Sequence, residues 1–475
     1  MNKVDKEQRN IATKGSMFFN WIVWLFLSAF ILLLPYIYYR AEIIYHGAMG
    51  KMYFKYYIIS LAGIFFWGVV LKLKDEIRAN IVMVTTSLVI GLYLAEAVIG
   101  FALHSKVVAA KAGIEFDTRT KREVIRDLKS EGLDTVPAVN PATLMKWLHK
   151  ESAETLFPLG GVSDKTTVYC NESGKYAVFT SDRYGFNNPD AEWDSLPIKW
   201  LLTGDSFTQG ACVNPGEDVA GQIRSITGES AINLGNNGNG PLIELAALRE
   251  YAESTRPKKV LWLYFEGNDL SGNLSRERAI PLLLRYLQPG FAQHLIQRQR
   301  EIDSRLDRHI TQARTTSVIH KTGLLRLQQI RRLIGLDNVS IDISPLFTEI
   351  LATARERTAA WGGQLYFVYL PEFSRYINAV GDHELYRKRR EIIDEVKRLD
   401  IPVIDIHRDV FENHPDPLSF FPFRIHAHYN AQGYNEVARA IVASVGYNRT
   451  PPRTTGNFKA RSKGQSEPVR VFYDR

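Results

Sequence analysis

The chain has 475 residues, of which 45% are hydrophobic and 23% are charged, and its formal net charge is +8. This length exceeds that of one ordinary domain, and the composition excludes a wholly disordered protein. The positive charges form no stripe with interleaved aromatic side chains, so solvated lysine and arginine faces explain them better than nucleic-acid binding. No residue spacing suits zinc, and we expect neither a metal nor a cofactor.

Three apolar runs open the chain and predict a membrane region over residues 1–105. Residues 15–39 and 56–71 carry no charge, and residues 81–103 contain one charged side chain, Glu96. Runs of this length can span a bilayer. The expected membrane helices cover about 15–39, 54–72 and 79–103. Glu96 is costly in hydrocarbon, and it is either a functional group or a carboxylate within reach of water or a lysine stem.

The loops between these helices predict the orientation of the chain. Seven Lys and Arg residues precede the first helix or lie between the second and third, against five on the other side. Because positive loops stay inside, the amino terminus is expected in the cytoplasm. Three crossings then place the large carboxy-terminal domain outside it, as in a multi-pass protein of a bacterial inner membrane. With only two crossings, the domain would be cytoplasmic.

Strand and helix patterns alternate regularly after a mixed connecting segment, 106–180. The strand-like runs are Lys199–Thr203, Ala231–Leu234, Val260–Phe265, Gln364–Leu370 and Ile401–Ile406. The helical patterns are Val219–Ile226, Leu242–Ser254, Pro345–Trp361, Glu384–Arg398 and Ala431–Val445. This alternation implies right-handed crossovers and a parallel sheet covered on both faces. The predicted fold class is α/β, with a three-layer α/β/α domain of five parallel strands over residues 181–446.

Two further segments depart from this alternation. Residues 271–344 form an insertion whose pattern predicts amphipathic helices. Apolar side chains lie among arginines in it: Leu283, Leu284, Leu287, Leu295 and Ile296. The insertion is either a helical cap on the domain or a lid that gates substrate. Residues 447–475 are polar, basic and proline-bearing, which predicts a disordered tail.

Polar residues gather at the ends of the predicted strands. Gly204-Asp-Ser206 follows the first strand, the loop 235–240 follows the second, Asn268 follows the third, and His428 precedes the last helix. The carboxyl ends of parallel strands share one edge of the sheet, so these residues are expected to converge there. Acyl transfer needs a nucleophile, a base beside it and donors aimed at an oxyanion. A serine, a histidine, backbone N–H groups and an asparagine amide can supply all of these.

These four blocks resemble those of the SGNH (GDSL-type) hydrolase superfamily, over roughly residues 180–446. The resemblance implies a flavodoxin-like arrangement of the sheet. It implies that Ser206 is the nucleophile and that its own N–H is one oxyanion donor. It also implies that His428 is the base and that Asn268 donates to the oxyanion. Gly238 would supply the remaining donor, with Gly235 as the alternative.

Two positions depart from the family pattern. Glu266 stands at the first position of the third block, where the family usually has glycine, while the asparagine stays in register. The fourth block usually has an aspartate two or three residues before the histidine, and here those positions are His426 and Ile425. The orienting acid is therefore missing from its usual place. Substitutes are Asp416, Asp405 or a backbone carbonyl in a Ser–His dyad.

Two smaller features bear on the same edge of the sheet. Cys170 and Cys212 are the only cysteines, and they form either one disulfide that would brace the serine turn or two unpaired buried thiols. The glycines of loop 235–240 are spaced G-x-x-G-x-G, which departs from the dinucleotide fingerprint and disfavours nicotinamide binding.

The resemblance implies a serine-dependent esterase or O-acyltransferase that acts on acyl esters, above all acetyl esters. By likeness to membrane-tethered members, its substrate is expected to be an acylated envelope glycan or exopolysaccharide, or a small ester. The alternative is a catalytically degenerate domain that binds a glycan or a partner within a membrane assembly. The missing aspartate supports the alternative, and the retained Ser206, Asn268 and His428 argue against it.

Overall fold

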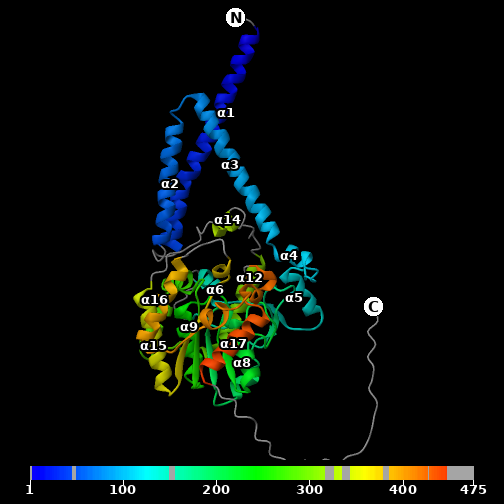
Figure 1. Cartoon of the computed structure of the whole chain (residues 1–475), viewed down its shortest axis with the longest axis vertical. Coiled ribbons are helices and arrows are strands. Elements are labelled where there is room, and N and C mark those ends of the chain that lie inside the picture. The colour runs from blue at the N-terminus through cyan, green and yellow to red at the C-terminus, as the bar shows by residue number, and fades with distance from the viewer. Residues whose placement is uncertain are drawn as a thin grey trace, which may run out of the picture.

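The computed structural model of the chain describes residues 3–44, 50–148, 156–315, 326–333, 343–377, 384–425 and 427–446. The molecule has two parts that lie end to end, a set of three long helices and an α/β domain (Figure 1). The expected tail at 447–475 and two stretches of the expected insertion, 316–325 and 334–342, lie outside the described residues.

The three expected membrane spans are helices. They are α1 (Lys3–Tyr38), which continues as the π-helical turn η1 (Tyr39–Ile44), α2 (Gly50–Val70) and α3 (Asp75–Ala102). Each contains a stretch that is long and apolar enough to cross a bilayer: Met17–Ile43, Tyr53–Val70 and Asp75–Ala102. The helices meet through Val23, Leu27 and Trp67, and Phe26 stacks on Trp67 with 4.7 Å between the ring centroids. Many other apolar side chains of these helices face outward, as lipid-facing residues do.

The connecting segment forms a small sheet with flanking helices, and many of its apolar side chains belong to the core of the α/β domain. It comprises α4 (Ser105–Lys111), α5 (Lys121–Ser130), β1 (Thr135–Pro137), α6 (Pro141–Leu148), β2 (Thr166–Val168) and β3 (Val178–Thr180). Strand β2 pairs in parallel with β1 and antiparallel with β3. Tyr169 and Phe179 of this unit pack against Ala211 and Cys212, just beyond the serine turn. The segment is therefore attached directly to the α/β domain.

The main sheet has five parallel strands, which confirms the predicted fold class. They are β4 (Trp200–Gly204), β5 (Ala231–Asn233), β6 (Lys259–Phe265), β7 (Gln364–Leu370) and β8 (Val403–Asp405). Their spatial order is β5-β4-β6-β7-β8, so the first strand along the chain lies between the second and the third. This is the doubly wound, flavodoxin-like order, in which the chain reverses direction between β4 and β6. Ligands of such sheets bind at that reversal, beyond the carboxyl ends of the strands.

Helices cover both faces of the sheet and complete three layers. One face carries α9 (Pro241–Ala247), its π-helical continuation η3 (Leu248–Ala252), α15 (Pro345–Ala360) and α16 (Glu384–Arg398). The other carries α8 (Val219–Thr227) and α17 (Ala431–Ser444). The strands are buried on both faces, which explains their nearly continuous apolar sequences. Short turns complete the domain: η2 (Asp190–Asp194), η7 (Phe373–Tyr376), η8 (His407–Phe411), η9 (Pro417–Phe420) and η10 (Pro422–Arg424).

The insertion between β6 and β7 is helical, as expected. Its described elements are η4 (Asp269–Asn273), α10 (Leu274–Glu277), α11 (Pro281–Leu284), η5 (Arg285–Leu287), η6 (Leu295–Arg298), α12 (Gln299–Thr315) and α14 (Gln328–Leu333). Leu283, Leu295, Ile302 and Leu306 are buried in the same core cluster as helix α9. This packing fits a helical cap on the domain.

A cluster of buried carboxyl groups lies between α9 and the start of the insertion. Glu277 accepts hydrogen bonds from the N–H groups of Gly240 and Leu242, whereas neither carboxyl oxygen of Glu244 has a partner among the described residues. Burial raises the pKa of Glu277 to about 7. Burial also raises the pKa of Glu244 well above its usual range, and the nearby Asp269 and Glu277 raise it further. The surroundings of Glu244 therefore favour its neutral form.

We expect Glu244→Gln to reduce the loss of stability with rising pH. The pKa of Glu244 is higher in the folded than in the unfolded chain, so its contribution to stability is complete below the unfolded pKa and is lost as pH rises through the folded pKa. Between these two values the wild type loses about 1.4 kcal/mol of unfolding free energy per pH unit through this group, and the variant does not. Unfolding of the detergent-solubilised protein from about pH 5 to about pH 8 measures the difference. Parallel pH profiles for the two proteins would contradict the burial argument.

Candidate active site

The serine turn lies where β4 meets the short helix α7 (Ser206–Gln209). Asp205 is buried, and its carboxylate accepts a hydrogen bond from the N–H of Phe207 at 2.9 Å, which caps the helix. A Cβ atom at Gly204 would collide with Thr208 and with the carbonyl of Leu263, so only glycine fits the turn. Ser206 is thereby held at the carboxyl end of the central strand, on the side where the chain reverses between β4 and β6.

His428 lies against the serine hydroxyl. It is held in the loop before α17, and its Nε2 is 2.9 Å from Ser206 Oγ. The imidazole ring packs on Phe207, with 4.8 Å between the ring centroids. The two residues that the sequence analysis proposes as nucleophile and base are therefore within hydrogen-bond distance, although 222 positions separate them in the chain.

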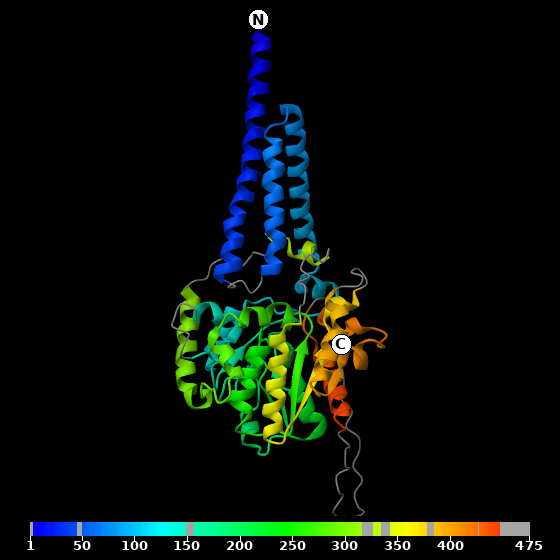
Figure 2. The ribbon, with the colours of Figure 1, turned by 90° about the vertical axis from the view of Figure 1, so that its left-hand side faces the viewer.

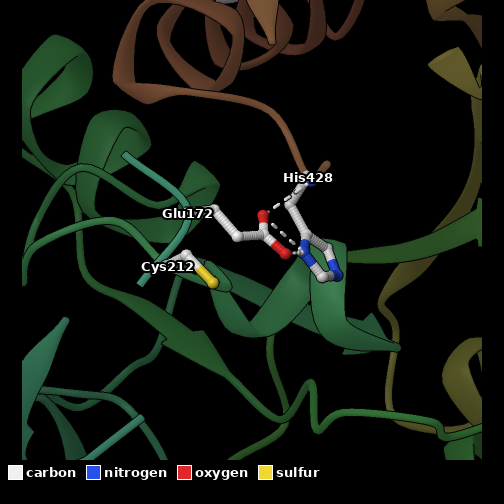
Figure 3. A group of neighbouring side chains, drawn as sticks. All are labelled: Glu172, Cys212 and His428. Atoms are coloured by element: carbon white, nitrogen blue, oxygen red, sulfur yellow. Dashed lines mark hydrogen bonds and ion pairs between the residues drawn. The ribbon is translucent and has the colours of Figure 1, made fainter. Parts of the chain in front are cut away.

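A carboxylate contacts the other nitrogen of the imidazole, and it belongs to Glu172. Both carboxylate oxygens lie 3.0 Å from His428 Nδ1, and Oε2 also accepts a hydrogen bond from the His428 backbone N–H at 2.9 Å (Figure 3). A carboxylate only accepts hydrogen bonds, so the contact assigns the proton to Nδ1 and leaves Nε2 free to accept the proton of Ser206. The three side chains form the Ser–His–acid arrangement of serine hydrolases.

The acids that the sequence suggested for this role are elsewhere. Asp405 forms an ion pair with Arg389 at the end of β8, and Asp416 forms one with Arg424. Neither carboxylate contacts His428, and a dyad held only by a backbone carbonyl is equally wrong, because Glu172 occupies Nδ1. No local sequence pattern pointed to Glu172, because it lies in the connecting segment, 256 positions before the histidine.

The disulfide explains how so distant an acid reaches the site. Cys170 and Cys212 are bonded, with 5.0 Å between their Cα atoms. Cys212 lies six positions after Ser206, and Glu172 lies two positions after Cys170, within about 7 Å of chain. Atoms of Glu172, Cys212 and His428 lie within 4.8 Å of one another (Figure 3). The sulfur of Cys212 belongs to the disulfide and is therefore no thiolate ligand for a metal.

The electrostatics of the site favour a histidine that readily holds a proton. Burial by itself lowers the pKa of His428, but the Glu172 carboxylate, through its charge and its hydrogen bond, raises the pKa above the usual value for histidine. The nearby charge of Asp205 acts in the same direction. Burial raises the pKa of Asp205 itself, while the hydrogen bond from Phe207 and the charge of His428 oppose that shift. Stabilising the imidazolium is what a base needs once it has taken the serine proton.

The expected oxyanion donors surround the serine turn. The N–H of Gly235 donates to Asn233 Oδ1 at 2.8 Å, whereas no acceptor pairs with the N–H of Gly238 among the described residues. This difference favours Gly238 over Gly235 as the free donor. The amide of Asn268 is oriented by Asn273, whose Nδ2 donates to Asn268 Oδ1 at 3.0 Å. Its own Nδ2 donor is thereby directed away from Asn273.

The loop 235–240 is joined to the serine turn by several contacts. The Asn237 N–H donates to Gln209 Oε1 at 2.9 Å, and Asn239 Nδ2 donates to the carbonyl of Gly204 at 3.3 Å. Asn273 Nδ2 donates in addition to the carbonyl of Asn239 at 2.6 Å. Ser206, Gly238 and Asn268 are therefore held in one network at the point where the sheet reverses, and their role as oxyanion donors stays a prediction.

Glu266, which replaces the usual glycine of the third block, links two segments of the domain. It is buried, forms a two-pronged ion pair with Arg375 and accepts a hydrogen bond from the N–H of Glu372 at 2.7 Å. Tyr369 also donates to it at 2.5 Å. The glutamate thus ties the end of β6 to the chain that follows β7, and Asn268 keeps its register beside it.

Comparison with known proteins adds structural likeness only. No known family profile and no curated protein matches the chain. It is similar to the solved structure of a lipase/acylhydrolase from Enterococcus faecalis, at 16% identity and a TM-score of 0.31, over 52% of this chain and 95% of that one. It is also similar to an acetylxylan esterase from Geobacillus stearothermophilus, at 13% identity and a TM-score of 0.29, over 54% of this chain and 97% of the esterase. A third similar structure is that of a G-D-S-L family protein from Desulfitobacterium hafniense. It has 12% identity and a TM-score of 0.30, over 52% of this chain and 99% of that protein.

One of these neighbours is described as a member of the G-D-S-L family, whose serine motif this chain resembles. Their TM-scores are low, so the fold is assigned from the strand order of this chain and the site from its own distances.

We expect Glu172→Gln to slow the reaction of Ser206 with a fluorophosphonate probe by up to about 10⁴-fold, because the amide neither stabilises an imidazolium nor fixes the productive tautomer. Only neutral His428 accepts the serine proton, so reactivity falls as pH drops through the pKa of His428. Since Glu172 raises that pKa, the acid limb of the pH profile should move to lower pH in the variant. Asp416→Asn serves as the matched control and should leave both rate and profile unchanged. Equal labelling rates for the wild type and Glu172→Gln would show that Glu172 plays no part in activating Ser206.

Opening the disulfide should have a related but smaller effect. We expect the double variant Cys170→Ala, Cys212→Ala to react roughly 10-fold to 100-fold more slowly, because Glu172 is no longer held to within an ångström of its position. The same pair of substitutions introduced into Glu172→Gln should add little, since the group that the disulfide positions is already gone. A loss of the same size in both backgrounds would show that the disulfide acts on the fold and not through Glu172. Rates with the probe, measured beside thermal unfolding, separate these outcomes.

Proposed function

We propose that the α/β domain is a serine-dependent esterase or O-acyltransferase of the SGNH type. The observation that carries the proposal is the contact chain from Ser206 Oγ to His428 Nε2, and from His428 Nδ1 to Glu172. An unactivated serine hydroxyl is a weak nucleophile, and a base oriented by a third group is the recurring means of activating it.

The reaction follows from the positions of these groups. Ser206 Oγ attacks the acyl carbonyl carbon while its proton passes to His428 Nε2, and the Nδ1 proton remains hydrogen-bonded to Glu172. The N–H groups of Ser206 and Gly238 and the amide of Asn268 would stabilise the negative oxygen of the tetrahedral intermediate. Collapse expels the alcohol, which takes the proton from Nε2, and the acyl group remains as an ester on Ser206.

The second half-reaction decides between the two activities. His428 deprotonates either water, which releases a free acid, or the hydroxyl group of an acceptor, which receives the acyl group. The same residues serve both reactions. We propose an envelope glycan or exopolysaccharide as the carrier of the acyl group, because three helices long and apolar enough to cross a membrane precede the domain. Acetyl is the acyl group that the resemblance to the SGNH superfamily implies.

We further propose that the domain lies outside the cytoplasm, as in a bacterial inner-membrane protein with an extracytoplasmic domain. The excess of positive residues on the amino-terminal side of the helices supports this orientation. The Cys170–Cys212 disulfide supports it as well, since such bonds persist in oxidising compartments.

The alternative of a degenerate binding domain loses its main support. It depended on the absence of an orienting acid near His428, and Glu172 stands at that position. The alternative would still predict a folded protein whose serine does not react.

The test is covalent labelling of Ser206. A membrane-impermeant fluorophosphonate should label the wild-type protein on intact cells from which any outer barrier has been removed, and Ser206→Ala should abolish the labelling. His428→Ala should reduce the labelling rate by several orders of magnitude, because the base is lost. A folded wild type that stays unlabelled even in detergent would contradict the catalytic proposal. Labelling in detergent but not on cells would place the domain in the cytoplasm.

A further inference from the structure

The active-site edge of the sheet faces the membrane helices. In Figure 2 the green strand points toward the end of the domain that carries the three long helices, and in Figure 1 helix α14 lies between those helices and the domain. Ser206 follows β4 and His428 precedes α17, so both belong to this edge. The opposite edge, where α8 and α17 end, is the far end of the molecule.

The segment that follows the last long helix is hydrogen-bonded to the Glu172 loop and packs beside the segment that precedes His428. Asp117 donates its N–H to the carbonyl of Gly174 at 2.7 Å, and Asn171 Nδ2 donates to the carbonyl of Asp117 at 3.1 Å. These bonds hold the Glu172 loop. Phe116 packs on Phe423, with 6.2 Å between the ring centroids, just before the His428 loop.

Chain length limits how far the site can lie from the bilayer. Helix α3 ends at Ala102, and α4 takes up seven of the residues between it and Phe116. Seven helical residues and about seven extended ones span at most about 35 Å. Phe116, which packs beside the segment before His428, therefore lies within about one bilayer thickness of the end of α3.

Helix α14 brings the domain closer still. Glu96, which is 3% exposed, accepts hydrogen bonds from the N–H groups of Gln329 and Ile330 at 2.8 and 2.9 Å. The 28 residues of α3 are about 42 Å long, which exceeds the roughly 30 Å of hydrocarbon, so the helix extends beyond the hydrocarbon. Glu96 is only about 9 Å from the end of α3 next to the domain, so the insertion contacts the last turns of this helix.

Part of the site is open to solvent. Ser206 is 3% exposed, whereas the side chains of His428 and Glu172 are 23% and 27% exposed. Solvent therefore reaches the site at the loops of His428 and Glu172, which the segment after α3 contacts. Lys106 and Lys111, both exposed on α4, add positive charge that attracts anionic headgroups.

From these contacts we propose that Ser206 acts on an acyl ester carried by a lipid-anchored molecule at the bilayer surface, and not on an ester dissolved away from the membrane. This inference rests on the proposed serine chemistry and specifies its substrate class. A lipid anchor confines the ester to the layer that the site faces, and this confinement raises its effective concentration there.

The first test measures the position of the site. Full-length protein in vesicles of phosphatidylcholine and phosphatidylglycerol is labelled at Ser206 with a fluorophosphonate dye, and an acceptor dye is attached to lipid headgroups. Lys258→Cys, exposed before β6 at the far edge of the sheet, carries the same donor dye in a matched control. We expect clearly more energy transfer from Ser206 than from position 258. Labelled Ser206 with no more transfer than the control would overturn the inference and leave the serine chemistry intact, whereas absent labelling would contradict the proposed function.

The second test compares two forms of one ester. The acetyl ester of 4-methylumbelliferone is offered either in water or linked to the headgroup of phosphatidylethanolamine in the same vesicles, at equal total concentration. We expect the anchored form to be cleaved roughly 100-fold faster, with Ser206→Ala inactive on both. Equal rates for the two forms would overturn the preference for a membrane-bound carrier.

Discussion

The bond between Glu172 and His428 is the interaction on which the rest of the site depends. The α/β domain supplies Ser206 and His428, but its Asp405 and Asp416 do not orient the imidazole, since both are paired with arginines elsewhere. The acid comes from the connecting segment, whose position is secured by the Cys170–Cys212 disulfide. The candidate active site is thus assembled from the connecting segment and the sheet domain, which share one hydrophobic core.

The same segment also links the site to the three long helices. The chain that leaves α3 bonds to the Glu172 loop and packs beside the segment before His428, while Glu96 accepts hydrogen bonds from the first turn of α14. A carboxylate in an apolar helix is costly, and two backbone N–H groups offset that cost. The same contacts that make Glu96 tolerable therefore hold the insertion against α3.

Charge is distributed unevenly around the serine. At the surface of the site, Glu172 raises the pKa of His428, whereas in the interior burial raises those of Asp205, Glu244 and Asp269. Burial therefore disfavours negative charge at Glu244 and Asp269, where it would oppose an oxyanion. The charge of Glu172 stands beside His428, where it stabilises the imidazolium. This separation follows from solvent access, because a carboxylate keeps its charge where water or a cation compensates it.

The sequence by itself determined the parallel sheet, the three long apolar helices and the placing of Ser206, Asn268 and His428 at strand ends, because periodicity and strand-end geometry are local properties of the chain. It misplaced the acid, proposing Asp405 and Asp416, and it left the cysteines and Glu96 undecided. Those features depend on contacts across 42 to 256 positions of sequence. Only the tertiary structure decided them, since no local pattern records which distant loop packs beside an imidazole or which helix end meets a carboxylate.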